Sequence, residues 1–212
     1  MASYLIVPGW AGSGPNHWQT CWERDLPNAS RVAMADWLAP RRADWVNALD
    51  RAIRSASEAP VLVAHSIGCV VVAHWAALGT GRIRGALLVA PPDLDRKGCP
   101  ESLRDFAPVP RAPLRFGSRV VASDNDPFSE LSRSIQIAFD WGSEVTVLES
   151  AGHINSDSGL GRWPEGRALL HDFVDSRSRA DLEHLDVPLA WAGGGGPSPD
   201  RDDSRWICRG SD

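Results

Sequence analysis

Short apolar runs alternate along the chain with stretches whose apolar residues recur at helical spacing. Continuous apolar runs predict buried strands at residues 4–7, 60–64, 85–90 and 118–122, a weaker run predicts a strand at 31–34, and the last strand is predicted at 144–148. Helical spacing predicts helices at 17–24, 42–55, 67–78, 130–140 and 164–174, with Leu131, Ile135 and Phe139 of the fourth helix facing inward. Apolar strands that alternate with helices are typical of a mostly parallel sheet covered on both faces, an α/β fold without a large lid domain.

The chain divides into a folded domain at residues 1–176 and a predicted disordered tail at 177–212, where the apolar periodicity stops and glycine, proline and aspartate accumulate. Inside the domain, residues 91–117 carry prolines at 100, 108, 110 and 113 and show little periodicity. This segment is long for a connection, so we expect it to cover a site.

Composition narrows the class of protein further. With 43% hydrophobic and 23% charged residues the chain is typical of a globular protein, and its net charge of −5 argues against a non-specific nucleic-acid binder. Neither a signal peptide nor a long apolar span is evident, which predicts a cytoplasmic protein without membrane insertion. The four cysteines and six histidines show no metal-ligand spacing, so we expect no metal and no cofactor.

The clearest chemical motif is the run Ala64-His65-Ser66-Ile67-Gly68, between a predicted buried strand and a predicted buried helix. This is the context of a nucleophile elbow, in which a strained strand-to-helix turn projects a serine hydroxyl above the sheet. The usual pattern is Gly-x-Ser-x-Gly, and Ala64 replaces the first glycine with another small residue. The alternative is that Ser66 only caps the following helix, because serine is a favoured N-cap.

A serine hydroxyl needs a base to become a good nucleophile. In this kind of fold the acid and then the histidine follow the serine along the chain. Asp124 and Asp126 follow one predicted strand and His153 follows the next, so all of them are expected at the same edge of the sheet as Ser66. Position does not choose between the two aspartates, since residues two apart near a strand end need not face the same partner, and either could instead cap the next helix.

Two backbone N–H groups are expected to form an oxyanion hole. One belongs to Ile67, directly after Ser66, and the other to Trp10 in the glycine-rich loop after the first strand. The same loop places Gly9, His17 and Trp18 where they would border a substrate pocket. The chain has ten tryptophans against five phenylalanines and one tyrosine, and this excess favours either an aromatic pocket wall or a tryptophan-rich core.

Four segments, LIVPGWAGSGPNHWQTCWE, VLVAHSIGC, ASDNDPF and AGHIN, resemble the small serine hydrolases of the retinoblastoma-binding protein 9 type, within the α/β-hydrolase superfamily. The resemblance extends over about residues 3–175. It implies a Ser-Asp-His triad in which Ser66 is the nucleophile and His153 the base. The acid of that family directly precedes Pro-Phe, which matches Asp126.

The sequence therefore predicts a serine hydrolase that cleaves a small carboxylic ester, or an amide, through an acyl-enzyme on Ser66. Its expected partner is a small-molecule ester, with no nucleic acid and no membrane. Two alternatives remain: an acyltransferase that uses the same triad, and a non-catalytic interaction protein built on a hydrolase scaffold.

Overall fold

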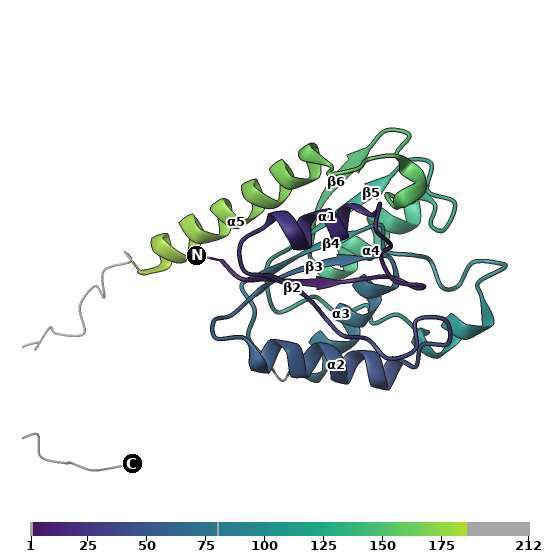
Figure 1. The fold of residues 1–212 in the computed structure, drawn as a ribbon, viewed down its shortest axis with the longest axis horizontal. Coiled ribbons are helices and arrows are strands. Elements are labelled where there is room, and N and C mark those ends of the chain that lie inside the picture. Colours follow the sequence, from purple (N-terminus) through teal and green to yellow (C-terminus); the bar gives the residue numbers. More distant parts are fainter. Residues whose placement is uncertain (1, 80, 186–212) are drawn as a thin grey trace, which may run out of the picture.

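The computed structural model describes residues 2–79 and 81–185 (Figure 1). In this part of the chain six strands form one sheet in the order β2-β1-β3-β4-β5-β6, and every neighbouring pair is parallel. The strands are β1 (Tyr4–Val7), β2 (Ala29–Arg31), β3 (Val61–His65), β4 (Gly85–Val89), β5 (Ser118–Ser123) and β6 (Glu144–Leu148). The α-helices are α1 (Trp18–Asp25), α2 (Arg42–Ser55), α3 (Ile67–Leu78), α4 (Leu131–Trp141) and α5 (Pro164–Leu185).

Helices cover both faces of the sheet, so the predicted fold class is confirmed. In Figure 1, α1 and α5 lie above the sheet, and α2 and α3 lie below it. The apolar side chains of the central strands alternate between two cores: Leu62 and Ala64 pack with α2, α3 and α4, whereas Val61 and Val63 pack with α1 and α5. Strands buried on both faces need no polar alternation, which explains their continuous apolar runs.

Three predicted details differ from the structure. The second strand is at Ala29–Arg31 and not at 31–34, because its ladder with β1 begins at Ala29 and only one further bond, from the N–H of Val32, follows it. The inward face predicted for α4 is wrong: Ile135 and Phe139 are 44% and 79% exposed, whereas the stripe of Ile137, Ala138 and Trp141 is buried. Both stripes have helical spacing, and the observed orientation buries the large Trp141 ring while its Nε1–H donates to the carbonyl of Pro110 at 2.8 Å.

The last helix, α5, also differs: it continues to Leu185 and does not end at residue 174. The beginning of the predicted tail is therefore helical, and the rest of that prediction lies outside the described residues. In Figure 1 the end of α5 extends past the sheet. Within the described ranges, no helix is long and apolar enough to cross a membrane.

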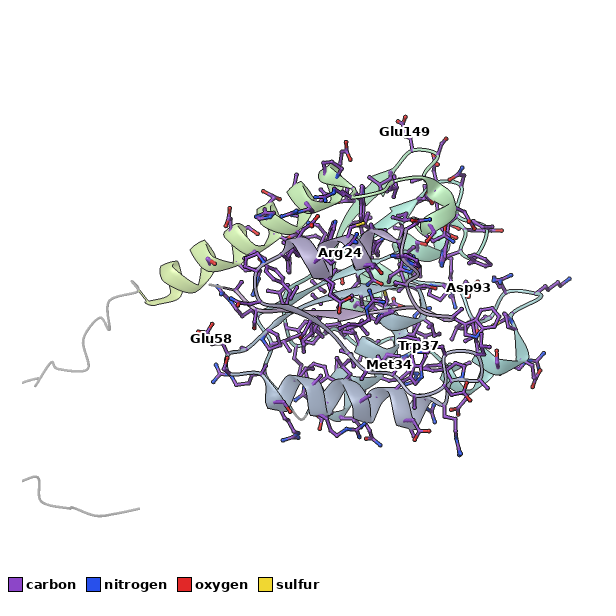
Figure 2. All side chains as sticks on the ribbon, viewed as in Figure 1. Arg24, Met34, Trp37, Glu58, Asp93 and Glu149 are labelled. Atoms are coloured by element: carbon purple, nitrogen blue, oxygen red, sulfur yellow. The ribbon has the colours of Figure 1, made fainter. Side chains whose placement is uncertain are left out.

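The loops that follow the strands meet at one end of the sheet. Figure 2 labels Asp93, in the segment after β4, at this end, and Glu58, just before β3, at the opposite end. In a parallel sheet, the carboxyl ends of the strands are where functional groups gather. Residues 91–117, which include a 3₁₀ helix at Glu101–Phe106, connect β4 to β5 here.

Candidate active site

Ser66 stands at a sharp turn between β3 and α3. Its backbone has φ 55° and ψ −129°, a conformation that non-glycine residues rarely adopt. Its N–H donates to the carbonyl of Val89 at 2.9 Å, which fixes the turn to the neighbouring strand. In a run where Val61–His65 and the first residues of α3 are buried, Ser66 alone is partly exposed. The turn therefore presents one hydroxyl above the sheet.

Two glycines let the chain approach closely enough to form this turn. A Cβ on Gly68 would lie 2.5 Å from the carbonyl oxygen of Val7 and 2.7 Å from that of Pro8. A Cβ on Gly9 would lie 2.8 Å from the Cβ of Ser66. The loop after β1 therefore rests directly against Ser66 and the first turn of α3. The motif's other small residue, Ala64, is fully buried within β3.

The structure brings Ser66, His153 and Asp126 together. The Nε2 atom of His153 lies 2.9 Å from the Oγ of Ser66. Its Nδ1 atom lies 2.8 Å and 3.0 Å from the two carboxylate oxygens of Asp126. Because an ionised carboxylate can only accept, the proton sits on Nδ1, which leaves Nε2 free to accept the proton of Ser66. Both side chains of the His–Asp pair are at least nine-tenths buried.

Asp124 has a different task from Asp126. Its Oδ1 accepts the N–H of Ser150 at 2.7 Å, in the loop that carries His153. The next two N–H groups of that loop are bound in the same way: that of Ala151 by the Oγ of Ser123 at 3.0 Å, and that of Gly152 by the Oδ1 of Asn125 at 2.7 Å. Three consecutive side chains at the end of β5 thus hold three consecutive N–H groups after β6. Sequence reasoning considered Asp124 as a catalytic acid or as a helix cap, and missed this contact with the loop after β6.

Two carbonyls of the same loop accept hydrogen bonds from buried side chains. The Nε2–H of His65 donates to the carbonyl of His153 at 3.0 Å, and the Nε1–H of Trp18 donates to the carbonyl of Ile154 at 2.7 Å. The prediction that Trp18 lines the pocket is therefore wrong: it is 1% exposed and packs edge-on against Trp22 and Trp163. A ring this large is most stable where its surface is buried and its N–H finds an acceptor, and both conditions are met under the loop.

His17 lines a cavity beside Ser66. Its Nδ1 accepts the N–H of Gln19 at 3.1 Å and caps α1, so its proton is on Nε2. Burial lowers the pKa of His17 to about 4, and the positive charge of Arg31 adds to the effect. Burial likewise holds the pKa of His65 well below its usual value. Both rings are neutral at pH 7 and place no positive charge beside His153.

The predicted oxyanion donors lie on the two segments that meet at Ser66. Ile67 is the first residue of α3, and Trp10 follows Gly9 in the loop pressed against Ser66. Among the described residues, neither backbone N–H has a backbone acceptor, whereas the N–H groups of Ala11 and Gly12 are both bound. The side chain of Trp10 donates its Nε1–H to the carbonyl of Leu38 at 3.1 Å, which fixes the loop from outside.

A cavity of about 230 Å³ opens beside Ser66 and His153. Gly9 and His17, two of the three residues expected to border a substrate pocket, line it together with Trp10. Further lining residues come from the proline-containing segment, with Leu94, Arg96, Cys99 and Leu103, and from Phe128 after β5. Of the segment 91–117 that was expected to cover a site, residues 92–103 contribute to the lining of this cavity, and residues 104–117 do not. Within the described ranges, no three His, Cys, Asp or Glu side chains are grouped as metal ligands.

The parallel sheet with helices on both faces, and the strand-turn-helix around Ser66 that follows β3, are those of the α/β-hydrolase fold. A family model described as serine hydrolase matches residues 4–172, and the chain belongs to this family. A YdeN-like hydrolase from Pectobacterium atrosepticum is similar in structure, with 30% identity, a TM-score of 0.75, and coverage of 84% of this chain and 92% of that one. None of the curated proteins compared with the chain matched it.

More distant structures share the fold. The ydeN gene product of Bacillus subtilis is 22% identical, with a TM-score of 0.68, over 82% of this chain and 100% of that one. A thermophilic esterase from Thermogutta terrifontis is 15% identical, with a TM-score of 0.62, over 84% of this chain and 90% of that one.

Proposed function

We propose that the protein hydrolyses small carboxylic esters through a covalent acyl-enzyme on Ser66. The observation that carries the proposal is the continuous hydrogen-bond path from Ser66 Oγ through both nitrogens of His153 to the buried carboxylate of Asp126. A serine that served only as a helix cap would not need a base at hydrogen-bond distance. Membership of the serine hydrolase family supports the same reading.

The reaction follows from the geometry. Ser66 Oγ attacks the ester carbonyl while its proton passes to Nε2 of His153, and the C–O bond of the tetrahedral adduct then breaks as that proton passes to the leaving alcohol. A water molecule next gives its proton to Nε2 and attacks the acyl carbon, and Ser66 recovers a proton as the acid leaves. Asp126 keeps the imidazole in the Nδ1–H tautomer and stabilises the imidazolium formed in each half of the reaction.

The N–H groups of Trp10 and Ile67 are proposed to stabilise the oxyanion of both tetrahedral adducts. The support is their location on the two segments that touch Ser66, and their lack of backbone acceptors in the described part of the chain. Ile67 also begins α3, where the helix dipole favours negative charge. Donors already in place need no reorganisation as charge develops.

At a finer level, the motifs quoted above favour a hydrolase of the retinoblastoma-binding protein 9 type with carboxylesterase-like activity. The small cavity and the Asp-Pro-Phe sequence at residues 126–128 are consistent with that proposal. The esterase from Thermogutta terrifontis shares the fold and lends support at that level only.

Labelling with a fluorophosphonate probe and turnover of 4-nitrophenyl acetate test the proposal together. Ser66→Ala is expected to abolish both, whereas Ser132→Ala, an exposed serine on α4, is the matched control and keeps both. Undiminished labelling of Ser66→Ala would exclude Ser66 as the nucleophile. A wild-type protein that neither labels nor cleaves short acyl esters would favour the non-catalytic interaction protein instead.

A further inference from the structure

One wall of the cavity beside Ser66 combines apolar side chains with a single arginine. Leu94, Leu103 and Phe128 supply apolar surface, and Arg96 is half-buried among them. The other charged side chain in the described lining is Asp93, which shares the Arg133 guanidinium with the exposed Asp95, at 3.2 Å and 2.5 Å. Asp93 is therefore engaged by Arg133, and Arg96 is the one cationic side chain in this described lining.

Arg96 is held in place without an acidic partner. Its guanidinium carbon lies 5.0 Å from the centre of the Phe128 ring, and one NH donates weakly to the carbonyl of Lys97 at 3.4 Å. In the described part of the chain, Arg96 forms no ion pair with a carboxylate. A guanidinium carries five N–H donors, so most of its capacity remains available to a ligand, and the aromatic face fixes its position in advance.

Arg96 also stands at a useful position relative to the reacting groups. The Phe128 ring packs edge-on against the His153 ring, with centroids 4.5 Å apart, and presents its face to Arg96. The guanidinium is thus one aromatic ring away from the base. A substrate whose carbonyl lies at Ser66 and whose chain crosses the cavity would bring its far end to Arg96.

We propose that Arg96 binds a carboxylate at the far end of the substrate, so that the preferred substrates are esters carrying a second, ionised carboxyl group. This inference rests on the proposed ester hydrolysis. Arginine matches a carboxylate with two parallel hydrogen bonds, which are stronger in a partly desolvated cavity than in water. The net charge of the chain is −5, so a preference for anions has to come from this local contact and not from the overall field.

Two pairs of matched esters test the proposal. Methyl hexanoate and monomethyl adipate differ by a carboxylate on the acyl side, and butyl acetate and 4-acetoxybutanoate differ by one on the alcohol side. The wild-type enzyme is expected to show a higher kcat/KM for the anionic member of at least one pair, mainly through KM. In Arg96→Gln the ratio of anionic to neutral kcat/KM is expected to fall about 10- to 100-fold, the loss typical of a charge-assisted hydrogen bond.

Lys97→Gln is the matched control, because it removes the same charge one residue further along, at an exposed side chain that does not line the cavity. Its ratio is expected to equal that of the wild type. The proposal is overturned if the wild type prefers the neutral ester in both pairs, or if Lys97→Gln lowers the ratio as much as Arg96→Gln. It is also overturned if Arg96→Gln lowers kcat/KM equally for the anionic and the neutral ester of a pair, since Arg96 then only positions Phe128. Failure of the wild type to cleave any of the four esters counts against ester hydrolysis itself.

Discussion

Exchanging each of two neighbouring aspartates for asparagine separates the acid of the site from a loop contact. Asp126 is 2% exposed in its side chain, and its two oxygens face Nδ1 of His153 while Oδ1 also accepts the N–H of Phe128 at 2.8 Å. In Asp126→Asn the amide oxygen can keep the Phe128 contact, which turns the NH₂ group toward Nδ1. The imidazole proton then moves to Nε2, and His153 can no longer accept the proton of Ser66.

The expected loss from this tautomer change is about 10⁴-fold in kcat, or about 5 kcal/mol of transition-state stabilisation. Asp124→Asn keeps an oxygen that can accept the N–H of Ser150, on an exposed side chain. Its expected loss is no more than about fivefold, the size of one weakened hydrogen bond.

Steady-state hydrolysis of 4-nitrophenyl acetate by both variants, with urea unfolding as a check on folding, measures the difference. The reasoning is refuted if both asparagine variants retain similar activity, or if Asp124→Asn is the more damaged while both remain folded. A loss in Asp126→Asn that follows a loss of stability would point to a structural role instead. The same assays at several pH values show whether the remaining activity has lost its dependence on a base.

Three other substitutions test the surroundings of the site. Gly68→Ala is expected to lower the free energy of unfolding by about 1–3 kcal/mol, because its Cβ would lie 2.5 Å and 2.7 Å from backbone carbonyl oxygens. Gly14→Ala is the control, since a Cβ on Gly14 would have no atom within 4 Å, and it is expected to change urea unfolding little. Equal losses of stability in the two variants would contradict the argument that the chain approaches Gly68 closely. Asn125→Ala removes the acceptor of the Gly152 N–H and is expected to lower kcat about five- to tenfold, with KM nearly unchanged. A change confined to KM would show that this contact does not position His153. The folded-state pKa of His17 is about 4 against 6.5 for the free side chain, so the unfolded chain binds more protons between these values and stability falls as pH drops through that window. His17→Asn, which can still cap α1, is expected to remove up to about 3 kcal/mol of that fall in unfolding experiments between pH 7 and 4, and an unchanged pH slope would contradict it.

Contiguous motifs explain why so much of this protein followed from its sequence. The strand-turn-helix around Ser66 is written in consecutive residues, because buried strands and helices have distinct apolar patterns and the elbow needs small residues at fixed positions. The central strands, and the order of the serine, the acid and the histidine along the chain, could likewise be predicted from the sequence. These patterns also predicted that residues 91–117 would lie over the site, since long connections with little regular structure are uncommon and are often functional loops.

Contacts between distant segments were decided only by the tertiary structure. From spacing alone, Asp124 and Asp126 were equivalent; the loop after β6 lies so that one accepts a backbone N–H and the other faces the imidazole. Trp18 was predicted at the pocket wall, but the helix that carries it turns the ring toward Ile154 and away from the cavity. The meeting of Arg96 with Phe128 has no local signal either, because it joins the loops that follow two different strands. A site motif contained in consecutive residues can be predicted from the sequence. The residue that a side chain contacts across the fold depends on which loops the sheet brings together.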